Sequence, residues 1–266
     1  MKHKIFIASL VLSAVATNNL CADESVQVSL KEEKISLKTR DSIEIGLQSY
    51  WYKYEEEVNN AFFMSNTGYK YGLSATGIKT LADDYYVIAD ARYATGDVKY
   101  SSASGEGYVA DNRYEIRLLV GNEALVENYL LASYLGVGYR RLDNDLRDLG
   151  AGGYRRTSQY LYVPIGVTHR FLVDRASRLS TNIEYDYFVQ GEQKSYLSDV
   201  NVVYGDPVDK QKHGYGVRIN SAYEVRDWSA GAFFNYWHIG DSEKSYDGYE
   251  PKNDTKELGI EIKYRF

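Results

Sequence analysis

The last nine residues of the chain, Leu258-Gly259-Ile260-Glu261-Ile262-Lys263-Tyr264-Arg265-Phe266, alternate between apolar residues and small or charged ones. Successive side chains of a β-strand point to opposite faces, so residues two apart share a face. One face of this stretch is therefore wholly apolar and consists of Leu258, Ile260, Ile262, Tyr264 and Phe266. The stretch predicts a strand that separates an apolar medium from a polar one.

Nine earlier runs share this period of two, starting from Asp41. They lie near residues 43–51, 69–75, 85–93, 114–120, 135–140, 161–168, 182–189, 215–225 and 228–239. The run Trp228–Ile239 carries aromatic residues on both faces, so its register stays open. Together the runs predict an all-β fold, a closed antiparallel up-and-down transmembrane β-barrel of about ten strands.

Two observations decide which face of the strands points outward. The apolar face is aliphatic in its middle and often tyrosine towards its ends, as in strands that face lipid. The other face mixes glycine with opposite charges, which suits a confined interior where charges must pair. The predicted interior network consists of Glu44, Asp90, Arg92, Glu115, Arg117, Arg140, Glu184, Asp186, Arg218, Glu224 and Glu261. A soluble, tyrosine-rich β-sandwich that buries the apolar face is the alternative, since 27 of the 266 residues are tyrosine.

Barrel width grows with strand number, and about eight strands give an interior that side chains fill. We therefore expect no wide pore, although a narrow path for water or small ions stays open. The connections alternate in length. Short turns are predicted near residues 83–84, 122–128, 173–177 and 227, and long polar loops at 55–66, 101–112, 143–158, 192–212 and 241–254.

The N-terminus has the pattern of a secretory signal peptide, with Lys2 and Lys4 before a short apolar core. Cleavage after Ala16 or after Ala22 fits the small residues there, and we favour Ala22. The expected organisation is a signal peptide over 1–22, a short periplasmic extension over 23–40 and an outer-membrane barrel over 41–266. The single cysteine, Cys21, cannot form an internal disulfide, and lipid attachment to it is a minor alternative.

The C-terminal stretch resembles the assembly signal of outer-membrane barrel proteins, in which an aromatic last residue is read by the barrel-assembly machinery. The segments 160–167 (YLYVPIGV) and 114–121 (YEIRLLVG) resemble stretches common in uncharacterised outer-membrane β-barrel proteins. The resemblance covers Asp41 to Phe266. It implies the outer membrane of a Gram-negative bacterium and a cell-surface location, and it implies no particular activity.

A barrel of ten strands is also similar in architecture to the omptin surface proteases, which use paired aspartates and an Asp/His pair near the loops. That motif is missing here: the segment Gln193–Asp199 has no histidine beside its aspartate. The remaining enzyme hypothesis places His213 and His238 together at the outer rim, with Asp209 or Asp241 in reach. Histidine and aspartate at loop edges are more often simply solvated.

The charge balance, 31 Lys+Arg against 37 Asp+Glu, argues against a nucleic-acid partner. No metal-binding or phosphate-binding motif is present, and no cofactor is expected. Outer-membrane lipid and lipopolysaccharide are the expected partners of what we predict to be a monomer. Arg147, Arg155 and Arg156 have two predicted roles: a network with Asp143, Asp145 and Asp148, which we favour, and contact with the phosphates of lipopolysaccharide.

The predicted function is that of a non-catalytic surface protein, structural or receptor-like, with long extracellular loops that recognise a partner. An omptin-like or other rim hydrolase and a narrow small-solute channel are the alternatives.

Overall fold

The computed structural model describes residues 37–81, 84–244 and 248–266. These residues form eleven strands and two short 3-10 helices. The strands are β1 (Ser42–Val58), β2 (Ala61–Thr80), β3 (Tyr85–Ser102), β4 (Gly105–Val126), β5 (Tyr129–Asp145), β6 (Arg155–Leu172), β7 (Ser177–Ser195), β8 (Val208–Gln211), β9 (Gly214–Val225), β10 (Trp228–Ile239) and β11 (Lys252–Arg265). The helices are η1 (Arg147–Leu149) and η2 (Leu197–Asp199).

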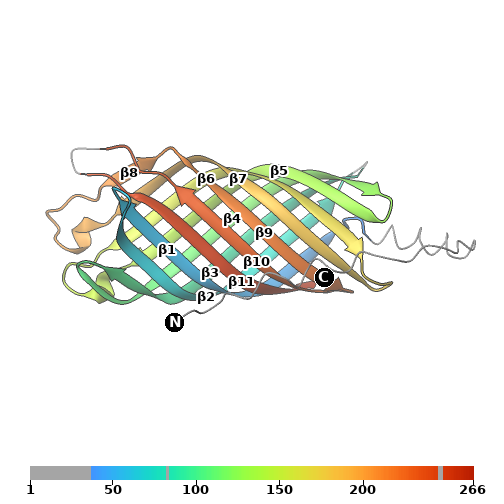
Figure 1. The fold of residues 1–266 in the computed structure, drawn as a ribbon, viewed down its shortest axis with the longest axis horizontal. Coiled ribbons are helices and arrows are strands. Elements are labelled where there is room, and N and C mark those ends of the chain that lie inside the picture. The colour runs from blue at the N-terminus through green and yellow to red at the C-terminus, as the bar shows by residue number, and fades with distance from the viewer. Residues whose placement is uncertain (1–36, 82–83, 245–247) are drawn as a thin grey trace, which may run out of the picture.

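Apart from β8, antiparallel pairing joins each strand to the next, with β7 followed by β9, and closes the sheet through β1 and β11 (Figure 1). The short β8 pairs with Gly191–Lys194 of β7, and β9 pairs with Ser177–Tyr187 of the same strand. Strand β8 is therefore an extra segment beside the loop-side half of β7. The prediction of a closed antiparallel barrel of about ten strands is confirmed. Within the described ranges, no helix has the length and apolar character that a membrane crossing needs.

The chain termini and the strand connections are divided between the two ends of the barrel. Both termini of the described chain and the turns β2–β3, β4–β5, β6–β7 and β9–β10 lie at one end, here called the terminal end. The connections β1–β2, β3–β4, β5–β6, β7–β9 and β10–β11 lie at the other, here called the loop end.

Two of the five predicted long loops are wrong. Residues 55–66 and 101–112 lie mostly in strands, and β1 and β2 are joined by Asn59 and Asn60 alone, both with positive φ. Asparagine tolerates this left-handed conformation, which tight hairpin turns require. At the end of β1 the outer face carries Lys53, Glu55 and Glu57, so the apolar period that revealed the rest of that strand is missing there.

The apolar face points outward, as Leu47 and Ile116 show with exposed fractions of 65% and 64%. The C-terminal residues Leu258, Ile260, Ile262 and Phe266 are likewise exposed. The register of β10, which the sequence left open, places Trp228 and Phe234 outside while Trp237 and Ile239 are fully buried inside.

Residues 1–36, which include the predicted signal peptide, Cys21 and most of the predicted extension, lie outside the described residues. The end of that extension, residues 37–40, is part of the barrel. Leu37 is fully buried against Tyr86, Leu130 and Ala132. The amide of Thr39 donates to both carboxylate oxygens of Glu123, at 3.1 and 3.0 Å. This short segment crosses the lumen at the terminal end.

We predict that Ile116→Arg destabilises the folded barrel in lipid vesicles by about 2–4 kcal/mol, because it places a charge in the middle of the apolar outer belt. Tyr108→Arg is the matched control: it lies on the same face of β4, 70% exposed, near the loop end. That change should cost about 0–1 kcal/mol. Urea unfolding followed by fluorescence measures both, and equal effects would contradict the outward orientation of the apolar face.

Candidate functional site: a filled lumen and a cavity at the loop end

Eleven charged residues were predicted to face the interior, and the structure places all of them there. Arg218 of β9 is the centre of the middle layer. Its Nε donates to Asp186 at 2.7 Å and lies 3.1 Å from Glu184, and its Nη1 donates to Glu115 at 3.0 Å. One guanidinium thus links carboxyl groups from two different strands, β4 and β7.

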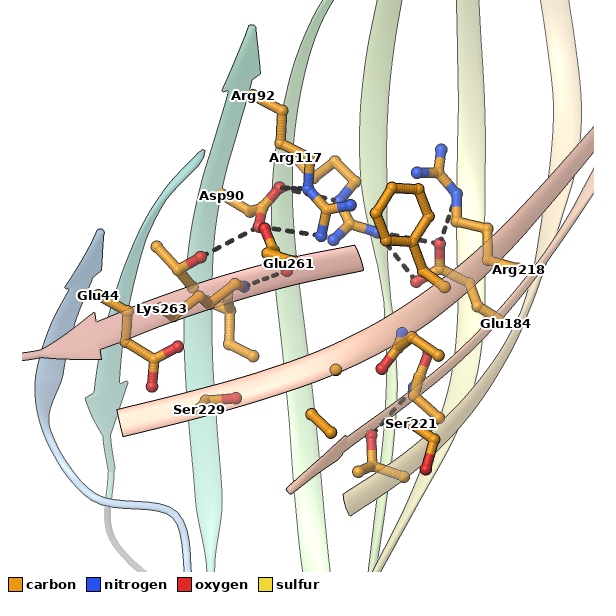
Figure 2. Close-up of a pocket in the computed structure, with 18 of the residues that line it drawn as sticks. Glu44, Asp90, Arg92, Arg117, Glu184, Arg218, Ser221, Ser229, Glu261 and Lys263 are labelled. Atoms are coloured by element: carbon orange, nitrogen blue, oxygen red, sulfur yellow. Dashed lines mark hydrogen bonds and ion pairs between the residues drawn. The ribbon is translucent and has the colours of Figure 1, made fainter. Parts of the chain in front are cut away.

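The layer continues towards β3, as Figure 2 shows. Arg117 donates to Glu184 at 2.9 Å and lies 3.4 Å from Asp90, which also accepts from Arg92 at 3.0 Å. Glu261, on β11, accepts from Ser74 at 2.7 Å. These side chains surround a small interior cavity of about 210 Å³. Because the ion pairs join strands across the lumen, they hold opposite walls of the barrel together.

The remaining predicted charges lie in layers above and below. At the terminal end, Arg265 bridges Glu44 and Glu224 at 2.7 and 2.9 Å. Towards the loop end, Arg140 donates to Glu257 at 3.1 Å, and Glu257 also accepts from Arg113 and from Asn235.

Sequence reasoning did not assign Glu257, Arg113, Lys70 or Asp111 to the network. All four are buried, and Lys70, with no exposed surface, pairs with Asp111. The signal that places them was present, since each lies an even number of residues from an interior position of the same strand. Arg113, for example, precedes Glu115 by two residues.

A layer of buried aromatic side chains separates the middle charges from the loop end. Tyr50, Tyr52, Tyr162 and Trp237 are at most 1% exposed. The hydroxyl of Tyr162 donates to Glu115 at 2.7 Å, and the Arg218 guanidinium lies 5.6 Å from the ring centres of Tyr162 and Trp237. The aromatic layer is thus bonded to the charged layer beneath it.

Each of several inner tyrosines lies against a glycine on the neighbouring strand. Tyr162 is paired in register with Gly138, and a Cβ at Gly138 would lie 2.2 Å from the tyrosine ring. The same arrangement joins Tyr134 to Gly166, Tyr86 to Gly121 and Tyr160 to Gly191. Glycine lets these rings lie flat on the wall, so the lumen fills without pushing the strands apart.

The loop end contains a larger cavity of about 710 Å³, here called the loop-end cavity. Its polar part is a buried trio in which Arg156 donates to Glu56 and, at 2.6 Å, to Glu250. Burial raises the pKa of Glu250 well above its usual range; Glu56 adds to this rise, and Arg156 opposes it. Its apolar lining includes Met64, Leu146, Leu149, Phe63, Pro207, Pro251 and the rings of Tyr100, Tyr154 and Tyr249.

The arginines predicted to contact lipopolysaccharide are all engaged with carboxylates. Arg147 pairs with Asp145 at 2.6 Å, and Arg155 pairs with Asp199 at 2.8 Å. The expectation for Arg156 is wrong, because its side chain lies inside the barrel, 8% exposed, between Glu56 and Glu250.

The predicted histidine site is arranged differently from the expectation. His238 pairs through Nδ1 with Asp254 at 2.8 Å, not with Asp209 or Asp241, and Asp254 also accepts from Tyr236. His213 lies just before β9, where its carbonyl accepts the amide of Gly240. His238 shares the outer face of β10 with Tyr236, so this pair faces away from the lumen. In the described ranges, no group of three or more His, Cys, Asp or Glu is placed to hold a metal ion.

No protein-family model and no curated protein sequence matches the chain. Solved structures do match its shape. The outer membrane protease OmpT from Escherichia coli aligns with a TM-score of 0.51 and 14% identity, over 85% of this chain and 96% of that one. The chain has the fold of an outer-membrane β-barrel.

Two further solved barrels have lower scores. The translocator domain of the autotransporter NalP from Neisseria meningitidis has a TM-score of 0.44 and 15% identity, with 91% of this chain and 95% of that one covered. OprG from Pseudomonas aeruginosa has a TM-score of 0.40 and 12% identity, with coverage of 86% and 97%. At these identities the likeness concerns the fold and not the activity.

We predict that Gly138→Val destabilises the barrel by at least about 2 kcal/mol, since the new side chain must displace the Tyr162 ring from the wall. Gly77→Val is the matched control in β2, because a Cβ there meets nothing within 4 Å. It should be neutral or slightly stabilising. Denaturant unfolding of both variants in vesicles tests the difference, and a harmless Gly138→Val would show that the ring is not held there.

Arg218→Met should cost about 3–5 kcal/mol, because it leaves Glu115, Glu184 and Asp186 buried without their common partner. Arg141→Met removes an exposed pair with Asp143 and should cost no more than about 1 kcal/mol. Adding Asp186→Asn to Arg218→Met should recover part of the loss, since one buried charge disappears. A double variant as unstable as the sum of the two single changes would contradict the proposed coupling.

Proposed function

We propose that this protein is an outer-membrane barrel that acts at the bacterial surface without catalysis, as a receptor-like element whose loop-end cavity takes a small ligand. The observation that carries this proposal is the filling of the lumen. Charged layers occupy its middle, aromatic side chains close it towards the loops, and Leu37 lies across the terminal end. A barrel filled in this way has its accessible chemistry at its ends.

The cell-surface location is supported by the apolar outer belt and by the outward-facing C-terminal strand that ends in Phe266. In this proposal the loop end faces the outside of the cell and the terminal end faces the periplasm, as in bacterial barrels with short periplasmic turns. The signal peptide over residues 1–22 and reading of Phe266 by the barrel-assembly machinery belong to the same proposal. So does contact of the outer belt with lipid and lipopolysaccharide.

Two alternatives have less support. A channel needs a continuous path, whereas Tyr52, Arg140 and Trp237 are at most 1% exposed in the middle of the lumen. A rim hydrolase has one observation in its favour, the contact between His238 and Asp254. That contact lies on the outer wall, where Asp254 is shared with Tyr236 and the His238 ring packs on Tyr215, and not in the loop-end cavity. We therefore place the function in the cavity.

We predict that the protein fractionates with the outer membrane, shifts its gel mobility on heating and gives no stable conductance steps in planar bilayers. Removing the aromatic layer by Tyr52→Ala with Trp237→Ala should produce resolvable steps, because both side chains fill the cross-section. Tyr71→Ala, 63% exposed on the outer face, is the matched control and should stay closed. Steady conductance of the unaltered protein would replace the receptor-like proposal with a channel.

A further inference from the structure

The charge of the loop-end cavity is strongly one-sided. Its lining contains four acidic side chains, Glu56, Glu106, Asp209 and Glu250, against the single basic side chain of Arg156, and of the four Glu106 is paired with Lys99 at 2.6 Å. Arg156 is already engaged, because it donates to both Glu56 and Glu250. One positive charge between two carboxylates leaves the trio with a net negative charge when both carboxylates are ionised.

Such a trio is costly to bury without a further partner. Glu56 and Glu250 are 1% and 6% exposed, so little water reaches their charges. The Nε of Arg156, itself 8% exposed, makes no hydrogen bond within the described residues. Once Glu250 is ionised, the polar part of the cavity therefore carries one negative charge that no group of the trio balances.

The remaining wall is apolar and aromatic. Met64 and Leu146 are 1% and 5% exposed, and the rings of Tyr100, Tyr154 and Tyr249 also line the space. Aromatic faces attract cations, and apolar side chains take up the hydrocarbon part of a ligand. A volume of about 710 Å³ lies within the range of small-molecule sites.

We propose that the loop-end cavity binds a small organic amine that carries an apolar body, with its ammonium group at Glu56 and Glu250 and its body against Met64, Leu146 and Tyr154. This inference rests on the proposed receptor-like function and names its ligand class. The ammonium supplies the second positive charge that the trio lacks. The aromatic lining favours a ring-bearing amine over a polyamine, which has no apolar body to bury.

The groups around Glu250 predict how binding depends on pH. Tyr54 and Glu56 of β1, Asp209 of β8, Tyr154 and Arg156 all act on this carboxyl. Because burial, Glu56 and Asp209 raise the pKa of Glu250, it takes up a proton at a higher pH than an exposed glutamate. Protonation removes the charge that the ammonium needs, so amine affinity should fall as the pH falls through that raised pKa.

The test uses the full-length mature protein in lipid nanodiscs and isothermal titration with benzylamine. Benzyl alcohol and phenylacetate are the neutral and anionic probes of similar shape, and empty nanodiscs give the background. We expect saturable binding of benzylamine and affinities at least about tenfold weaker for the other two probes. Equal binding of benzylamine and benzyl alcohol would overturn the proposal, because it would show that the carboxylates take no part.

Glu250→Gln should weaken benzylamine binding at least about tenfold and leave benzyl alcohol unchanged. Glu57→Gln is the matched control, since Glu57 lies next to Glu56 but pairs with Lys252 on the outer face. Heat-shifted gel mobility checks that each variant is folded, and Glu56→Gln replaces Glu250→Gln if the latter fails that check. Unchanged benzylamine binding in a folded variant refutes the inference. Conductance or misplaced fractionation instead refutes the proposed function, so the two failures are distinguishable.

Discussion

The buried charges of the lumen constrain the rest of the structure. Lipid outside the belt cannot solvate a charge, and the interior leaves little room for water, so each inner arginine must find a carboxylate, and many find one on another strand. Arg218 does this for Glu115, Glu184 and Asp186, which come from β4 and β7. Backbone hydrogen bonds join only adjacent strands, whereas these ion pairs reach across the lumen. The ion pairs therefore link strands that share no backbone hydrogen bonds into one network.

That network also depends on steric fit between neighbouring strands. The Tyr162 ring rests on Gly138, and its hydroxyl meets Glu115, so one residue belongs to both the packing and the charge network. A larger residue at Gly138 would affect both. Filling and charge pairing are thus coupled, because the aromatic side chains that exclude water also make an unpaired charge beside them more costly.

The period-two pattern predicted the barrel, its strands and which face of each strand points outward, because side-chain alternation follows directly from strand geometry. It did not predict strand length beyond the membrane belt, since β1 continues to Val58 with polar residues on its outer face. The pattern also did not predict which charged residues form ion pairs with one another. Which carboxylate meets Arg218 depends on register across the barrel, and a single strand contains no information about that register.

Tyrosine illustrates a second limit of the sequence. An abundance of tyrosine suggested girdles at the membrane boundaries, and Tyr71 does lie outside, 63% exposed. Tyr50 and Tyr52 lie inside instead, and composition cannot separate the two groups. Arg156 shows the same limit: it was grouped with Arg155 as a surface cation, although neighbouring residues of a strand must face opposite ways. Strict use of the alternation would have placed Arg155 and Arg156 on opposite faces of one strand.

The closed lumen and the polar trio at the loop end suggest a division of roles within one barrel. In the middle layer Arg92, Arg117 and Arg218 share several carboxylates from other strands and their own, and the space left there is about 210 Å³. At the loop end a single arginine serves two buried carboxylates beside a space more than three times larger. What distinguishes the loop end is therefore the open volume beside its charged groups. The proposed amine would occupy that volume and place its ammonium group beside the two carboxyl groups that share Arg156.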